Sequence, residues 1–256
     1  GSTEFYRLLS RPMYQASTVY LVEDNVSDAD LEKNQLMYTQ PLVPGTALPR
    51  FCPPSSSCMV VHRNRLFLVG DDGITVWYSG QFVDGEQPWF NPQFTFQVPK
   101  GGPITALESM DGVLYVFKRD FIFSVSGDGP ADNGAGNDLS TPEELDIEVG
   151  CIEPRSLVVA PGGILYQSPR GIYMLTRGRA INYIGKNVEV FMTFDDEIVG
   201  ADISDENNCI YIEVRSTYNQ YYPLTIVYDY LHEIWFVDFK MIGGTPTTDG
   251  FIVGAT

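Results

Sequence analysis

The sequence predicts an all-β protein, a β-propeller of four to six blades built from three- to four-stranded antiparallel sheets. Short apolar runs rich in β-branched and aromatic residues alternate with Gly, Pro, Asn and Asp turns. This alternation is typical of antiparallel strands joined by hairpins. One strand–turn–strand–turn–strand unit also recurs along the chain, and none of its runs is long enough for an ordinary helix.

The clearest copy of this unit lies between Cys151 and Leu175. Turns rich in Gly and Pro separate its apolar runs, at residues 161–163 and 168–171. We therefore expect three strands in it, namely Leu157–Ala160, Ile164–Gln167 and Ile172–Leu175.

Three further copies begin at Cys58, Ile104 and Ile198. The expected strands are Cys58–Val61, Leu66–Val69, Ile74–Tyr78 and Phe94–Val98 in the first copy; Ile104–Leu107, Val113–Phe117 and Phe121–Val125 in the second; and Ile198–Ile203, Cys209–Val214 and Leu224–Tyr228 in the last. The last copy ends in a hairpin over residues 226–239.

The central strands of the four copies align on Leu66, Leu114, Leu165 and Ile210, with spacings of 48, 51 and 45 residues. A period of about 40 to 50 residues with three or four strands indicates a β-propeller, in which neighbouring blades cover one another. A Greek-key sandwich also has many short strands, but it gives no reason for a repeated unit. We predict that these four residues occupy equivalent core positions.

The chain divides into residues 1–54, which hold N-terminal strands and a Pro-rich linker, and residues 55–256, which hold the repeats. Phe251–Ala255 resembles Ile198–Ala201, the start of a copy, yet no complete copy follows it. Because an open strand edge invites aggregation, we expect Phe251–Ala255 to share a sheet with an N-terminal strand. The alternative is a piece cut from a longer propeller. The N-terminal strand candidates are Phe5–Leu9, Thr18–Val22 and Leu36–Thr39.

The composition is strongly acidic, with 33 acidic and 16 basic residues and a formal net charge of −17. This charge argues against affinity for duplex DNA, which depends on contacts between Lys or Arg and phosphate. None of the apolar runs approaches the length of a membrane-spanning helix.

The four cysteines lack the CxxC spacing of zinc sites. Cys52 and Cys58 could form a disulfide in an oxidising compartment, whereas free thiols are expected in a cytosol. We expect Cys151 and Cys209 to be small core residues.

Catalytic motifs are absent from the sequence: there is no Gly-x-Ser-x-Gly elbow, no Walker loop and no His-Glu-x-x-His. We expect His62 and His232, the two histidines, to lie on the surface. The sequence therefore assigns no catalytic, cofactor-binding or metal-binding residues, and no cofactor.

Two acidic segments leave open a calcium site and a catalytic acid pair. The Gly/Asp/Asn-rich loop 127–141 could bind calcium, although Pro130 breaks the EF-hand pattern. Its oxygen donors are Asp128, Asp132, Asn133, Asn137 and Asp138. A glycosidase acid pair could come from Glu143, Glu144, Asp146 and Glu148, but clustered acids on a strand edge more often face solvent.

Several ordered phrases resemble virion proteins of tailed bacteriophages. The chain is similar to the tail nozzle and packaged-DNA stabilisation proteins of short-tailed phages, which carry β-propellers. The resemblance covers roughly residues 58–240, and members of that family are usually longer. The phrases are Val149–Ser156, Gly163–Ser168, Gly171–Leu175, Tyr183–Gly185, Val227–Tyr230 with Trp235, and Tyr6-Arg7.

The resemblance implies a structural virion protein of the tail, assembled in the host bacterial cytoplasm, and no enzyme. It also implies self-association in a ring, expected to be hexameric, and contact with portal, adaptor or tail-fibre proteins. Packaged DNA would pass without specific binding, because like charges repel over the screening length of about 10 Å.

Two other classes remain. A carbohydrate- or receptor-binding propeller would stack ligands on exposed aromatic rings, and a glycoside hydrolase would need two facing carboxylates. The candidate stacking residues are Trp77, Trp89, Tyr218, Tyr221 and Tyr222.

Overall fold

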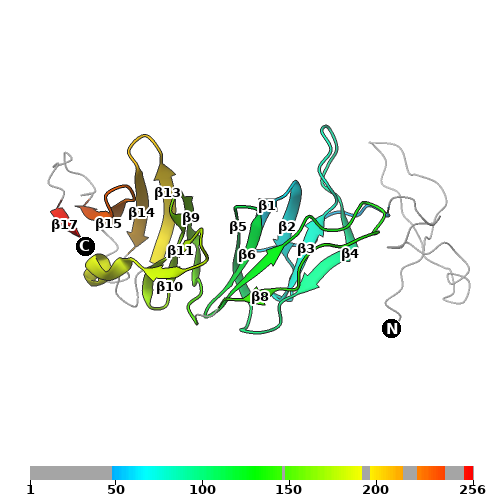
Figure 1. Cartoon of the computed structure of the whole chain (residues 1–256), viewed down its shortest axis with the longest axis horizontal. Helices are drawn as coiled ribbons and strands as arrows, with labels where there is room; N and C mark the ends of the chain where they lie inside the picture. Colours follow the sequence, from blue (N-terminus) through cyan, green and yellow to red (C-terminus); the bar gives the residue numbers. More distant parts are fainter. Residues whose placement is uncertain (1–47, 146–147, 192–196, 216–223, 240–250, 256) are drawn as a thin grey trace, which may run out of the picture.

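The computed structural model describes residues 48–145, 148–191, 197–215, 224–239 and 251–255. The fold is all-β and of the propeller type: four antiparallel sheets follow one another along the chain (Figure 1). This confirms the predicted fold class. Within the described ranges, the structure contains one short 3-10 helix, η1 (Gly185–Phe191), and no helix long and apolar enough to cross a membrane.

Each sheet is a meander in which consecutive strands pair. The first sheet contains β1 (Met59–His62), β2 (Arg65–Val69), β3 (Thr75–Ser79) and β4 (Phe90–Gln97). The second contains β5 (Ile104–Met110), β6 (Val113–Lys118), β7 (Ile122–Ser126) and β8 (Glu143–Glu144). The third contains β9 (Glu153–Ala160), β10 (Gly163–Ser168), β11 (Gly171–Thr176) and β12 (Ile181–Tyr183). The fourth contains β13 (Glu197–Ser204), β14 (Cys209–Arg215), β15 (Leu224–Asp229), β16 (Ile234–Phe239) and β17 (Phe251–Ala255).

The first hairpin of the first two sheets is closed by two residues with positive φ. These are Arg63 and Asn64 (41° and 60°) between β1 and β2, and Asp111 and Gly112 (52° and 73°) between β5 and β6. Two-residue turns of this kind match the right-handed twist of the flanking strands. They therefore fix the register in which β1 pairs with β2 and β5 with β6.

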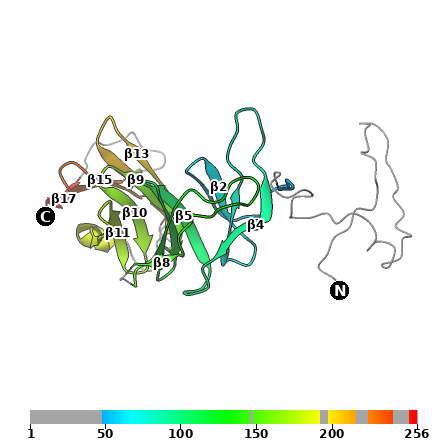
Figure 2. The same cartoon turned by 45° about the vertical axis from the view of Figure 1, so that its right-hand side comes forward.

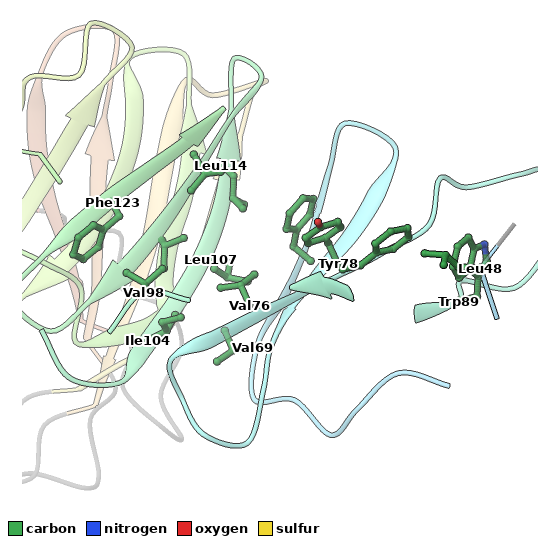
Figure 3. Close-up of a cluster of buried hydrophobic side chains, with 14 residues drawn as sticks. Leu48, Val69, Val76, Tyr78, Trp89, Val98, Ile104, Leu107, Leu114 and Phe123 are labelled. Atoms are coloured by element: carbon green, nitrogen blue, oxygen red, sulfur yellow. The ribbon is translucent and has the colours of Figure 1, made fainter. Parts of the chain in front are cut away.

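Three hydrophobic cores lie between consecutive sheets. The core between the first and second sheets is drawn in Figure 3 and includes Val76, Tyr78, Leu107, Leu114 and Phe123. The second and third sheets enclose a core that includes Phe117, Ile122, Ile164, Tyr166 and Leu175. The third and fourth enclose one that includes Leu165, Met174, Ile210, Ile226 and Trp235. Each inner sheet thus buries both faces.

The first strands of successive sheets, β1, β5, β9 and β13, contact one another in that order. The first sheet and the last sheet lie at opposite ends of the described part of the chain in both views (Figures 1 and 2). The sheets therefore stack like consecutive blades of a propeller, with their first strands together.

The predicted alignment of the central strands is wrong by one residue in the third sheet. Leu66, Leu114 and Ile210 are each the second residue of the second strand, and the matching residue in β10 is Ile164. Ile164 faces the second sheet, whereas Leu165 faces the fourth. Because successive side chains of a strand point to opposite faces, a one-residue shift moves a side chain into the other core. Leu66 is half-buried, unlike its three equivalents.

The strands predicted between residues 58 and 239, and the strand Phe251–Ala255, are present, and the structure adds details that the sequence analysis missed. β4 begins at Phe90, earlier than expected, and the short elements β8, β12 and η1 were not predicted. β17 pairs with β16 and so extends the fourth sheet to five strands. The N-terminal strands expected to join it lie outside the described residues.

All four cysteines are free thiols. Cys151 is buried as expected, and burial raises the pKa of its thiol to about 12. Cys209 is only half-buried, because it points to the opposite face of β14 from Ile210. The expectation that Cys209 is a core residue was therefore wrong.

A substitution at Gly150 tests the joint between the second and third sheets. A Cβ atom there would lie 1.9 Å from the backbone oxygen of Lys118, whereas a Cβ at Gly200 would meet nothing within 4 Å. We expect Gly150→Ala to lower the free energy of unfolding by about 1–3 kcal/mol in urea titrations, because the backbone must move apart. The matched control, Gly200→Ala, should stay within about 0.5 kcal/mol of the wild type. Equal stability of the two variants would contradict the close contact.

Candidate functional site: the polar loop between β7 and β8

The acidic loop that follows β7 reaches from the second sheet to the first. The backbone oxygen of Asp132 accepts a hydrogen bond from the amide of Leu48 at 2.8 Å. Its carboxylate accepts a longer one, at 3.4 Å, from the amide of Gln81. The loop suspected of binding calcium therefore bridges two blades.

The cation at the centre of this bridge is Arg65, whose side chain is completely buried (0 % exposed). Its guanidinium donates to the backbone oxygens of Asp128 (2.8 Å), Ser79 (2.8 Å) and Pro130. Three carbonyl oxygens thus converge on one cation, as they do around calcium. These backbone oxygens therefore have a donor within the chain itself.

Aromatic rings complete the surroundings of Arg65. Its guanidinium carbon lies 5.9 Å from the ring centroid of Tyr78 and 5.8 Å from that of Phe94. Desolvation lowers the pKa of Arg65, while neighbouring acids such as Asp132 counteract that shift. The charge is retained because an arginine stays protonated even when its pKa falls moderately.

The acidic and amide side chains of the loop hold its own backbone. The carboxylate of Asp138 accepts hydrogen bonds from the amides of Asp128 and Gly129, at 2.9 Å and 2.6 Å. The carboxylate of Asp128 pairs with Arg63, and the side-chain oxygens of Asn133 and Asn137 each accept a bond from the amide two residues on. Among the described residues, no group of three or more His, Cys, Asp or Glu is arranged to hold a metal ion.

His62 is buried (2 % exposed), so the expectation of a surface position was wrong. His62 is the last residue of β1 and lies on the same face as Val60, towards the second sheet. Its Nδ1 lies 2.7 Å from Oγ of Ser109. Nε2 is buried without a hydrogen-bond partner among the residues that the structure describes. A nucleophilic pair needs a third group that orients the histidine, and Nε2 has none. His232 is exposed, as expected, and pairs with Asp229 at 2.8 Å.

The carboxylates suggested for glycoside hydrolysis do not form a facing pair in the described part of the chain. Glu143 and Glu144 are exposed neighbours on β8 and so point to opposite faces. Glu144 pairs with Lys100 at 2.5 Å, and Glu143 lies 3.9 Å from Arg179. Glu148 is exposed, and Asp146 lies outside the described residues.

The aromatic residues suggested as stacking platforms differ in how exposed they are. Trp89 is buried in the first core, so the expectation that it could stack on a ligand was wrong. Trp77 is half-buried on the face of the first sheet that points away from the second sheet. The other three candidates, Tyr218, Tyr221 and Tyr222, lie outside the described residues.

Comparisons with known proteins give little further information. No protein-family model matches the chain, and no curated protein matches its sequence. One solved structure that it is similar to is PorZ, an essential bacterial surface component of the type-IX secretion system of Porphyromonas gingivalis. The sequences are 15% identical, the TM-score is 0.41, and the match covers 86% of this chain and 24% of PorZ. The chain thus spans about a quarter of that protein.

Replacing Arg65 by lysine tests the role of the guanidinium as an internal cation. A single ammonium group cannot bond three carbonyl oxygens in the planar arrangement that the fork of Arg65 provides. We expect Arg65→Lys to lower the free energy of unfolding by about 1–3 kcal/mol, because buried acceptors lose their donor, and to speed proteolysis within residues 127–141. Arg63→Lys, at an exposed ion pair, is the control and should change stability by less than about 1 kcal/mol. An unchanged cleavage rate for Arg65→Lys would show that the loop does not depend on the guanidinium.

The burial of His62 predicts that acid weakens the fold. Desolvation, aided by the positive charge of Arg63, lowers the pKa of His62 from 6.5 to about 4. At pH values between 4 and 6.5, His62 is protonated in the unfolded chain but neutral in the folded chain. The free energy of unfolding therefore falls as the pH drops from 6.5 towards 4. The expected loss is about 3 kcal/mol. Urea unfolding of the wild type and His62→Gln across this range measures it, and parallel pH curves for the two proteins would contradict the assignment.

Proposed function

We propose that this chain is a structural virion protein of a tailed bacteriophage, a tail nozzle or head-closure component that helps to retain and channel packaged DNA. Its copies would associate in a ring and contact neighbouring portal, adaptor or tail-fibre proteins. The proposal starts from the ordered phrases that resemble this family, and the geometry of those residues supports it.

The observation that carries the proposal is the place of these phrases in the fold: several of their residues join one blade to the next. The amide of Cys151 donates to the backbone oxygen of Lys118 at 2.8 Å, which joins the third sheet to the second. Nε1 of Trp235 donates to the backbone oxygen of Ile184 at 3.0 Å, which joins the fourth sheet to the segment after the third. In a tail protein of this kind, these contacts would make the stacked blades a rigid platform.

A second group of these residues stiffens the third sheet. Oγ of Ser156 donates to the backbone oxygen of Glu153 (2.6 Å) and accepts a bond from the amide of Gln167 (2.8 Å). The hydroxyl of Tyr166 donates to the backbone oxygen of Val149 at 3.3 Å. Ser156 and Tyr166 are fully buried, so these bonds act inside the structure.

The acidic charge suits a protein beside which DNA must slide. With a formal net charge of −17, the surface repels phosphates within the screening length of about 10 Å. Repulsion keeps the DNA mobile, since strong binding would require several contacts from Lys or Arg. The chain would thus guide DNA by its shape.

Electron microscopy of the complete protein, together with a DNA-binding assay, tests the proposal. We expect a closed ring with the blades at its periphery, and no binding of duplex DNA by fluorescence anisotropy between about 50 and 200 mM salt. A protein that stays monomeric at all concentrations, or that binds DNA tightly, would contradict the proposal. Binding on a glycan array, or glycan turnover, would favour the carbohydrate-binding or hydrolase class instead.

A further inference from the structure

One face of the first sheet is apolar, and the described residues cover it only in part: Leu68 is 3 % exposed, whereas the side chains of β1 on this face are largely exposed. Strand register places five side chains on it: Met59 and Val61 of β1, Leu66 and Leu68 of β2, and Trp77 of β3. Met59 and Val61 are 70 % and 59 % exposed. We call these five residues the outer face of the first sheet.

The strand positions of this face carry no charge, and the nearby carboxylate of Asp72, in the turn between β2 and β3, accepts a hydrogen bond from the hydroxyl of Thr75. The neighbouring positions on the same side of β3 and β4 are neutral, namely Thr75, Thr95 and Gln97. In a chain with 33 acidic and 16 basic residues, a neutral strand surface of this kind indicates contact with another apolar surface.

The other sheets show what normally covers this face. Leu107, Phe123 and Leu114 are the counterparts in the second sheet of Met59, Trp77 and Leu66, and all three are buried against the first sheet. In the third and fourth sheets the counterparts of Leu66 are Ile164 and Ile210, both buried against the preceding sheet. Because a preceding sheet covers the equivalent face of each later sheet, we expect a further blade to cover the outer face of the first sheet.

We infer that residues 1–47 of this chain supply that blade and pack on the outer face of the first sheet. These residues span about one repeat, since the corrected positions Leu66, Leu114, Ile164 and Ile210 are 48, 50 and 46 residues apart. The sequence predicts three strands among them, the number in the repeated unit. The inference does not depend on the proposed function.

The described residues before β1 run along the edge of the first sheet. Phe51 pairs with Phe90 at the start of β4, the last strand of the sheet, before the chain crosses to β1. In the link between the first and second sheets, by contrast, the chain leaves β4 and crosses to the next sheet at β5. Leu48 lies in the core between the first and second sheets, so residues 1–47 would reach the outer face by passing around the β4 edge. A second copy of the protein is the competing occupant.

Site-specific photo-crosslinking in the full chain identifies the occupant. p-Benzoylphenylalanine is incorporated at position 59 in place of Met59, and at position 231 in place of Leu231, which is 64 % exposed in the turn between β15 and β16. After irradiation, we expect an intrachain crosslink from position 59 to a peptide within residues 1–47, independent of protein concentration, and none of this kind from position 231. A crosslinked dimer, a crosslink to another part of the chain, or no crosslink from position 59 would overturn the inference.

A smaller substitution provides an independent measurement. In the full chain, Met59→Cys and Leu231→Cys are treated with a maleimide, and labelling is measured for each peptide by mass spectrometry, which separates these thiols from the native cysteines. We expect position 59 to react at least tenfold more slowly than position 231 at every protein concentration. Equal rates, or protection that disappears on dilution, would exclude cover by residues 1–47.

Discussion

The structure depends on one constraint: a small sheet with two apolar faces is stable only where neighbours cover both. The described sheets meet this constraint by stacking in chain order, which produces three cores between four sheets. The same constraint explains why the central strands are apolar on both sides, as in β10, where all six residues are buried. It also explains the meander topology, because consecutive strands joined by short turns make blades that can stack at once.

Two buried cations donate hydrogen bonds to backbone oxygens that the stacked sheets bury. Strand ends, loops and the links between blades carry backbone carbonyl groups into places that water does not reach, and each needs a donor. Arg65 supplies donors to three of them, and Lys118 donates to the backbone oxygens of Val98 and Gly102 in the link between the first two sheets. Desolvation lowers the pKa of Lys118, which shows that burial disfavours its charged form. The hydrogen bonds to the backbone oxygens offset part of this unfavourable desolvation.

The sequence was sufficient for the fold class and for the strands with strong apolar patterns, because turn chemistry and β propensity agree there. It failed where the pattern is uninformative. Ile164, Leu165 and Tyr166 are all apolar, so no alternation reveals which side chain faces which sheet. The position of His62 depends on Ser109 in another sheet, and the role of Arg65 depends on carbonyl groups of a distant loop. Backbone acceptors have no signature in a sequence, so the sequence left calcium open for loop 127–141, whereas the structure shows that Arg65 donates to backbone oxygens of this loop.

The order of the cores along the chain determines where local unfolding begins. Since each core joins only consecutive sheets, the stack behaves as a one-dimensional array in which a blade is stabilised by its nearest neighbours. The second and third sheets have two partners each, whereas a terminal sheet has one unless something else covers it. Opening should therefore begin at the ends and move inward, so that amide protons of β6 and β10 exchange last. Such an array tolerates local damage at one end while its centre keeps its shape.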